Sequence, residues 1–194
     1  MSLQNFVGKQ IRLVNNWFKH VDVSHFEKKT TRYLEIGALH GANFISFLKT
    51  YGSHDDSELF CIDPWEDYEE YPEYKNEQIS NFLIFMTNIN NLNKQEKQKI
   101  NIIKGHSNVE VLKLNDDFFD IIYIDGNHEP EYVLEDAVLC FRKLKKDGIL
   151  IFDDYGWGGP EMVEKAIDAF INVYKKRIQV LGIQHEQVFI KKIK

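Results

Sequence analysis

From Arg32 onward, short runs of apolar residues alternate with longer stretches in which apolar residues recur at helical spacing. The runs that predict strands are residues 33–36, 59–63, 100–104, 119–125 and 149–153. Each run is apolar almost throughout, which is typical of parallel strands that are buried on both faces. The alternation therefore predicts a sheet with helices covering both of its faces.

Amphipathic stretches lie between the predicted strands. Residues 134–144 and 162–170 each carry an apolar stripe that fits a helix packed on a sheet, and Pro160 suits the first turn of the second helix. Residues 82–92 predict another helix, and residues 3–20 predict a helix that precedes the first strand.

The end of the chain follows a different pattern. Residues 178–181 and 187–193 are strand-like, and the segment that joins them is too short for a helix, so they predict an antiparallel hairpin at the sheet edge. The whole pattern predicts an α/β, doubly wound fold with a mostly parallel seven-stranded sheet and a C-terminal antiparallel hairpin. Residues 31–194 would form this domain, and residues 1–30 would be an N-terminal helical extension.

Composition narrows the class of protein. The chain has 194 residues and is 43% hydrophobic, which suits one globular domain with a sizeable core. Its net charge of −6 argues against broad nucleic-acid binding. Cys61 and Cys140 sit in apolar runs and fit core packing in a reducing compartment better than a disulfide. With no pattern of a secretory signal or membrane span, we expect a cytoplasmic protein without a membrane partner.

Acidic residues stand at the ends of the predicted strands: Glu35, Asp63, Asp125, Asp153 and Asp154. In an open parallel sheet, ligands bind outside the carboxyl ends of the strands. Gathering this much negative charge is unfavourable unless a cation or hydroxyl groups offset it. The pattern therefore predicts a functional cluster at this edge of the sheet.

The first strand runs into the segment Tyr33-Leu-Glu-Ile-Gly-Ala-Leu-His-Gly41. Gly37 allows a sharp turn off the strand, and Gly41 allows the next helix to start close to that turn. The resulting notch lies beside the Glu35 carboxylate, which suits a flat, hydroxyl-bearing or positively charged small molecule better than a phosphate.

Two further segments fit the same ligand. Asp63 is placed to accept hydrogen bonds from both hydroxyls of a ribose, or else to cap the loop that follows it. After the third strand come Gly105, His106 and Ser107; Ser107 suits the cap of a helix through residue 114, and side chains here could reach an adenine edge.

The acids after the fourth and fifth strands point to metal chemistry. Asp125, Asp153 and Asp154 would make an oxygen-rich site that suits Mg²⁺ or Ca²⁺ rather than zinc, or Asp154 simply caps the next loop. His128 is either a general base or the cap of a helix that begins near Pro130. The aromatic, acidic residues 65–74, within the segment 64–80, are predicted to be a lid or a solvated loop, and residues 155–160 to be a substrate wall.

Together these motifs resemble class I S-adenosylmethionine-dependent methyltransferases, and within them the group of macrocin O-methyltransferase and related small-molecule or sugar O-methyltransferases. The motifs that carry the resemblance are Glu35-Ile-Gly37 with Gly41, Ile62-Asp63-Pro-Trp65, Ile124-Asp125-Gly-Asn-His128 and Gly148-Ile-Leu-Ile-Phe-Asp-Asp-Tyr155. The chain departs from the commonest pattern at Leu39, where a middle glycine often stands, and at His106, where many members have an acid.

The resemblance implies a Rossmann-like fold and a set of roles. Gly37 and Gly41 would border the methionine part of S-adenosylmethionine with Glu35 close by, Asp63 would bind the ribose, and His106 and Ser107 would lie near the adenine. Asp125, Asp153 and Asp154 would hold Mg²⁺, and Asp125 also counts among the cofactor-binding residues.

The predicted function is Mg²⁺-assisted O-methylation of a small hydroxyl-bearing substrate, a sugar or a phenol, with His128 and Asp125 as catalytic residues. The N-terminal helix could pair two subunits as a homodimer. The alternatives are a non-catalytic binding protein on this fold and a nicotinamide-dependent oxidoreductase. The oxidoreductase is disfavoured because Leu39 and Ala42 interrupt the expected glycine pattern, and a scaffold has no need of the paired Asp153 and Asp154.

Overall fold

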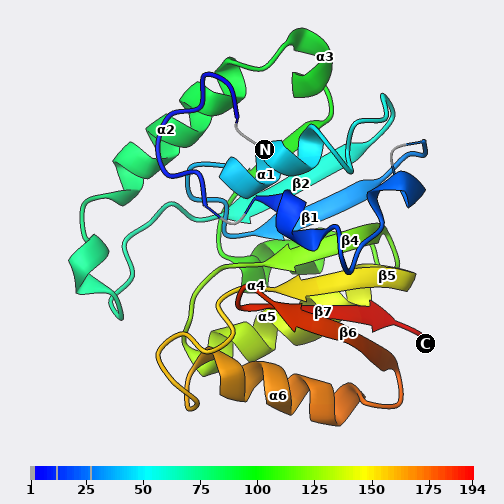
Figure 1. Ribbon diagram of the computed structural model, residues 1–194. Helices are drawn as coiled ribbons and strands as arrows, with labels where there is room; N and C mark the ends of the chain where they lie inside the picture. The colour runs from blue at the N-terminus through cyan, green and yellow to red at the C-terminus, as the bar shows by residue number, and fades with distance from the viewer. Residues whose placement is uncertain (1–2, 12, 27) are drawn as a thin grey trace.

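A computed structural model describes residues 3–11, 13–26 and 28–194. Its centre is a seven-stranded sheet with the strand order β3-β2-β1-β4-β5-β7-β6 (Figure 1). The strands are β1 (Arg32–Ile36), β2 (Glu58–Asp63), β3 (Ile100–Lys104), β4 (Phe119–Ile124), β5 (Leu144–Phe152), β6 (Ile178–Gln184) and β7 (Gln187–Lys192). Strands β1 to β5 pair in parallel, and β7 pairs antiparallel with both β5 and β6. The predicted fold class is therefore confirmed.

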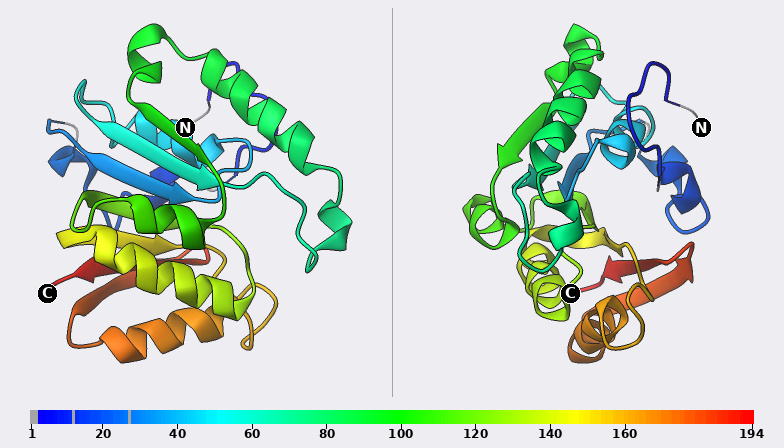
Figure 2. Two further views of the ribbon diagram at one scale, coloured as in Figure 1. Left: turned by 180° about the vertical axis from the view of Figure 1, so that it is seen from behind. Right: turned by 90° about the vertical axis from the view of Figure 1, so that its left-hand side faces the viewer.

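Helices cover both faces of this sheet (Figure 2). The α-helices are α1 (Ala42–Leu48), α2 (Gln78–Asn90), α3 (Lys94–Lys97), α4 (Ser107–Glu110), α5 (Pro130–Lys143) and α6 (Val163–Tyr174). Short 3₁₀ turns are η1 (Val14–Trp17), η2 (Val23–His25), η3 (Pro72–Tyr74) and η4 (Val111–Lys113). None of the helices in the described part of the chain has the length and apolar character needed to span a bilayer.

Two hydrophobic clusters pack on opposite faces of the sheet, because successive side chains of a strand point to opposite sides. Tyr33 of β1 belongs to the cluster with α1, α2 and the N-terminal segment, whereas Leu34 and Ile36 belong to the cluster with α5 and α6. The same alternation sends the Glu35 side chain to the face of Tyr33. Cys61 and Cys140 are free and buried, as expected for core packing.

The predicted N-terminal helix over residues 3–20 is wrong. In the described residues of this range, 3–11 and 13–20, the only helix is the 3₁₀ turn η1, which buries Val14 and Trp17 completely. The Trp17 ring packs against Tyr33, Tyr51 and Tyr123, and its indole N–H donates to Gln187 Oε1 at 3.1 Å. This tertiary packing, and not helical propensity, determines the path of the segment across the sheet. The homodimer stays a prediction.

Two predicted helix starts also differ. Helix α6 begins at Val163, so Pro160 lies in the preceding turn, where Gly156, Gly158 and Gly159 all have positive φ. Ser107 is the first residue of α4 and not its cap; the N-cap position is His106, whose side chain makes no capping hydrogen bond.

Candidate functional site

The turn between β1 and α1 requires glycine at its first position. Gly37 has φ +79°, and its N–H donates to Ile62 O at 2.9 Å. An ideal Cβ on Gly37 would lie 1.9 Å from the backbone oxygen of Asp125, so no side chain fits there. Gly41 has φ +82° and stands at the N-cap of α1, with the Phe85 ring 3.0 Å from the position a Cβ would take. The glycine turn is therefore packed directly against the end of β4.

The Asp63 carboxylate fixes this turn. Its Oδ2 accepts hydrogen bonds from the backbone N–H groups of Ala38 at 2.8 Å and Leu39 at 3.1 Å, and its Oδ1 accepts from Trp65 N–H at 2.8 Å. Burial raises the pKa of Asp63, and the three backbone N–H groups oppose that rise. The side chain thus ties the first two strand ends together at the point where the sequence predicts ribose binding.

Leu39 stands where a middle glycine is common, and its backbone keeps the conformation that glycine would take, with φ +46°. For a residue with a Cβ, this region costs roughly 1–2 kcal/mol. The N–H of Leu39 donates to Asp63, and its carbonyl accepts from the Trp65 indole N–H at 3.1 Å. These two bonds offset the strain, so the turn forms without the glycine.

We expect Asp63→Asn to destabilise the protein by about 2–4 kcal/mol, because one amide oxygen replaces a carboxylate that serves three N–H groups. Urea unfolding measures the change. The control is Asp67→Asn, since Asp67 is an exposed carboxylate that also accepts a backbone N–H, that of Asn76; its cost should stay below about 1 kcal/mol. Equal losses in the two variants would contradict the role given to Asp63.

A cavity of about 490 Å³ opens at the carboxyl ends of β1 to β4. It is bounded by the glycine turn, the loop before α4, the loop before α5 and residues 67–70. Of the predicted cofactor-binding residues, Gly37, His106 and Ser107 line it. Four other predicted residues do not line it: Glu35, Gly41, Asp63 and Asp125. Gly37 and Gly126, which do line it, belong to the same strand-end segments as Glu35, Gly41 and Asp125.

Sequence reasoning missed two acids of this cavity, Glu135 and Asp136, both on α5. Asp136 is 3% exposed, and it lies on the helix face that buries Val133, Ala137 and Cys140. A charged residue inside an apolar stripe is an unusual signal, since Asp is rarely buried without a partner. That signal was available in the sequence.

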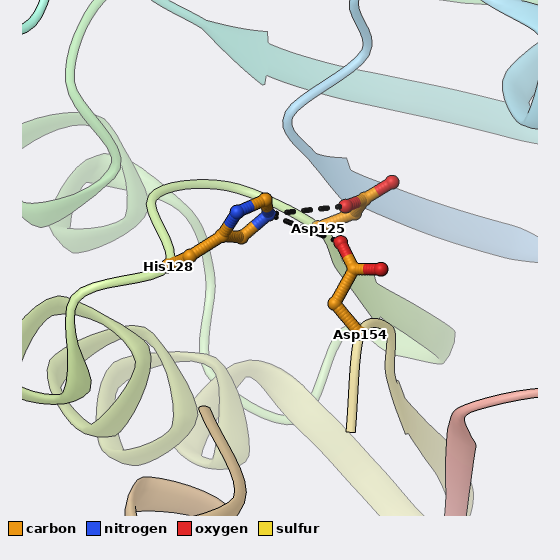
Figure 3. Close-up of side chains that lie close together, drawn as sticks. All are labelled: Asp125, His128 and Asp154. Atoms are coloured by element: carbon orange, nitrogen blue, oxygen red, sulfur yellow. Dashed lines mark ion pairs between the residues drawn. The ribbon is translucent and has the colours of Figure 1, made fainter. Parts of the chain in front are cut away.

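Beside the cavity, Asp125, His128 and Asp154 gather around one point (Figure 3). His128 Nε2 lies 3.1 Å from Asp154 Oδ2 and 3.9 Å from Asp125 Oδ1, and one ligand atom of each residue lies within 4.8 Å of the others. Asp125 follows β4, His128 belongs to the loop before α5, and Asp154 follows β5. The carboxyl ends of two parallel neighbouring strands thus bring the three side chains together.

Electrostatics couples these groups. Burial lowers the pKa of His128, but the carboxylates of Asp125 and Asp154 outweigh that effect and raise it to about 9. Burial raises the pKa of Asp125, and the charges of Asp153 and Asp154 add to the rise while His128 opposes it. The carboxylates of Asp125 and Asp154 thus favour the protonated form of His128, and His128 in turn favours the ionised form of Asp125.

Two other predicted acids lie deeper. Asp153 is 4% exposed; its Oδ2 accepts from the Tyr123 hydroxyl, and its Oδ1 accepts the Asp154 N–H at 2.8 Å. Glu35 is 1% exposed and accepts from the Tyr33 hydroxyl at 2.5 Å and from Asn43 Nδ2 at 3.0 Å. Burial raises the pKa of Glu35 well above its usual range. The group that faces a common point thus contains His128 in place of the predicted Asp153.

Two loops meet over this group. Tyr71, from residues 64–80, and Trp157, from residues 155–160, flank His128, with ring centroids 6.2 Å and 4.6 Å from the imidazole. Tyr71 and Trp157 are 6.0 Å apart, and Tyr71 is buried. The segment predicted as a lid or a solvated loop therefore contributes an aromatic side chain beside the predicted substrate wall.

The strand order, the closing hairpin and the glycine turn define a Rossmann-like methyltransferase fold. Residues 34–155 match the methyltransferase domain family, and the chain belongs to that family. No curated protein matches the sequence.

Solved structures share the fold at low identity. A Clostridium thermocellum protein described as a candidate rRNA-methylase is 16% identical, with a TM-score of 0.65 over 95% of this chain and 98% of that one. The O-methyltransferase TomG from Streptomyces achromogenes, solved with S-adenosylmethionine, is 12% identical with a TM-score of 0.64 over 92% and 79%.

The methyltransferase MycE of the mycinamycin pathway, solved with Mg and S-adenosylhomocysteine, is 14% identical with a TM-score of 0.61. The match covers 93% of this chain but 49% of MycE, so this chain spans about half the length of that protein. At such identities the likeness shows the fold alone.

Proposed function

We propose that this protein is an S-adenosylmethionine-dependent O-methyltransferase that acts on a small hydroxyl-bearing substrate with the help of Mg²⁺. The observation that carries the proposal is the adjacency of two features at the strand ends. A cavity of cofactor size begins at the glycine turn, and a carboxylate and imidazole centre lies beside it, joined to it through Asp125-Gly-Asn-His128.

The cavity suits a positively charged cofactor. Its lining includes the acids Asp67, Glu69, Glu70, Glu135 and Asp136, and no Lys or Arg among the described residues. Such walls attract the sulfonium of S-adenosylmethionine and repel the pyrophosphate of a nicotinamide dinucleotide. This charge pattern favours a methyltransferase over the oxidoreductase alternative.

The cofactor roles are those that the resemblance implies, and the place of Gly37, His106 and Ser107 in the cavity wall supports three of them. Gly37 and Gly41, with Glu35 beneath them, would border the methionine part, and His106 and Ser107 would face the adenine. Asp63 would bind the ribose while it also fixes the turn. S-adenosylmethionine supplies an electrophilic methyl group, and holding reactants in line contributes roughly 7–11 kcal/mol to such transfers.

The second centre suits a divalent cation. Asp125 and Asp154 offer carboxylate oxygens, the ligands that Mg²⁺ prefers, whereas the third predicted ligand, Asp153, accepts the Asp154 N–H. A bound Mg²⁺ would lower the pKa of a substrate hydroxyl. A bound cation and a protonated His128 would both interact with the carboxylates of Asp125 and Asp154. A cation at these carboxylates would therefore favour neutral His128.

In its neutral form, His128 would accept at Nε2 the proton of the hydroxyl that is methylated. Asp125 and Asp154, whose carboxylate oxygens lie 3.9 and 3.1 Å from Nε2, would orient the imidazole and offset part of the charge that it gains. The rings of Tyr71 and Trp157 lie beside His128 and would offer flat surfaces against which a ring of the substrate can rest.

Calorimetric titration tests the cofactor part of the proposal. We expect S-adenosylhomocysteine to bind with a dissociation constant at or below about 100 μM and NAD to bind at least tenfold more weakly. Tighter binding of NAD would replace the proposal with the oxidoreductase alternative.

Removal of the metal tests the second centre. With a panel of sugars and phenols as acceptors, EDTA should lower the rate of methyl transfer at least tenfold, and added Mg²⁺ should restore it. Unchanged turnover in EDTA would exclude the metal role. Binding of S-adenosylhomocysteine without transfer to any acceptor would favour the non-catalytic binding protein.

A further inference from the structure

A buried acid lies in the wall of the cavity, close to the loop that follows β4. Asp136 belongs to α5, which lies beside α4 (Figure 2). It lines the cavity together with Ser107, the first residue of α4, and its Oδ2 lies 3.4 Å from the position that a Cβ on Gly126 would take. Its carboxyl is thus enclosed by the loops that follow β3 and β4.

The cost of burying the Asp136 carboxyl is offset by fewer hydrogen bonds than the cost of burying Asp63. Asp63 accepts three backbone N–H groups, whereas the partner of the Asp136 carboxyl is the Ser107 side chain. Within the described residues, no Lys, Arg or His forms an ion pair with it. A buried carboxyl that keeps bonding capacity toward a cavity is typical of a ligand contact.

We propose that Asp136 recognises the amino edge of the cofactor's adenine, an inference that rests on the proposed function. The adenine edge presents an acceptor at N1 beside a donor at the 6-amino group. A neutral carboxyl presents a donor beside an acceptor and pairs with both, and a carboxylate still accepts from the amino group.

The surroundings of Asp136 favour the neutral form. Burial raises the pKa of Asp136 to about 7, with the Ser107 hydroxyl opposing the rise and the charge of Glu135 adding to it. His106, the other residue predicted near the adenine, is more exposed and lies 3.4 Å from the Glu66 carboxylate, on the rim of the cavity.

Binding of two ligands tests this assignment without any measure of turnover. The ligands are S-adenosylhomocysteine and its analogue with hydrogen in place of the 6-amino group, titrated into the wild type, Asp136→Leu, Asp136→Asn and the control Glu135→Gln. The wild type should prefer the amino ligand by roughly 10–100-fold, the range of a lost hydrogen bond to a buried polar group.

In Asp136→Leu the preference should fall to within about threefold of unity, through weaker binding of the amino ligand. Asp136→Asn should keep the preference, because its amide offers both a donor and an acceptor. Glu135→Gln, which removes the neighbouring charge from the same cavity wall, should keep it as well. Circular dichroism establishes that each variant is folded, and Asp136→Asn keeps the test decisive if the leucine variant is not.

Three results would overturn the inference. The first is a wild type that binds both ligands equally. The second is an Asp136→Leu variant that binds both more weakly by the same factor, because Asp136 would then only hold the loop of Ser107. The third is an Asp136→Asn variant that loses the preference. If the wild type binds neither ligand, the proposed function itself fails.

Discussion

Gly37→Ala is expected to destabilise the protein by about 2–5 kcal/mol and to abolish cofactor binding. The left-handed backbone conformation contributes roughly 1–2 kcal/mol of this cost. The remainder comes from the new Cβ, which would lie 1.9 Å from the backbone oxygen of Asp125. Gly37 and Asp125 stand at the ends of β1 and β4, so the clash can be relieved only if these two strands move apart. Overpacking of this kind costs about 1–3 kcal/mol.

Gly156→Ala is the matched control, since Gly156 also has a positive φ, +98°, but nothing lies within 4 Å of the position of its Cβ. Its cost should be the conformational part alone, about 1–2 kcal/mol. Urea unfolding gives the stabilities, and calorimetry with S-adenosylhomocysteine gives the binding. If the two variants lose equal stability and both keep binding, the contact between the glycine turn and β4 does not shape the site.

Asp154→Asn should lower the rate of methyl transfer by about 10²–10⁴-fold, the range expected when proton transfer and charge stabilisation are both impaired. Asp154 is the closest carboxylate to His128 Nε2, at 3.1 Å, and it does not line the cofactor cavity. The affinity for S-adenosylhomocysteine should therefore stay within about threefold of the wild-type value.

Asp168→Asn provides the comparison for Asp154→Asn. Asp168 is an acid of α6 that accepts a hydrogen bond from the Tyr155 hydroxyl at 3.1 Å, so the substitution perturbs the same loop without touching His128. Its turnover should remain close to wild type in single-turnover assays with an accepted hydroxyl substrate. An Asp154→Asn variant that also turns over normally would remove Asp154 from the mechanism.

Strands β1 to β4 could be predicted from the sequence because they are short and apolar for most of their length. Strand β5 begins at Leu144 and not at Ile149, because its first half contains the charged residues Lys145, Lys146 and Asp147, which hide it in the apolar pattern. β3 was predicted with the observed bounds, and the ends of β1 and β2 match as well. Helix starts were less predictable, since Pro160 and Ser107 satisfy local rules that the loop geometry does not use. The N-terminal segment was missed because the burial of Trp17 among aromatic rings from distant elements decides its course.

The candidate site could be predicted only in part from the sequence. Acids at strand ends could be expected at one edge of the sheet, and Asp125 and Asp154 do meet there. Which carboxylates face a common point depends on the alternation along each strand and on hydroxyl partners such as Tyr123, and neither is visible in a motif. Asp136 could not be predicted from strand ends, because it lies in the interior of α5.

A crystal structure of the protein soaked with S-adenosylhomocysteine and Mg²⁺ is the most direct test of the account. We predict density for the nucleoside in the cavity between Gly37 and Asp136, and for an ion on the carboxylates of Asp125 and Asp154. A ligand bound elsewhere, or an ion that avoids both carboxylates at saturating concentration, would contradict the proposal that these two neighbouring features form one methyl-transfer site.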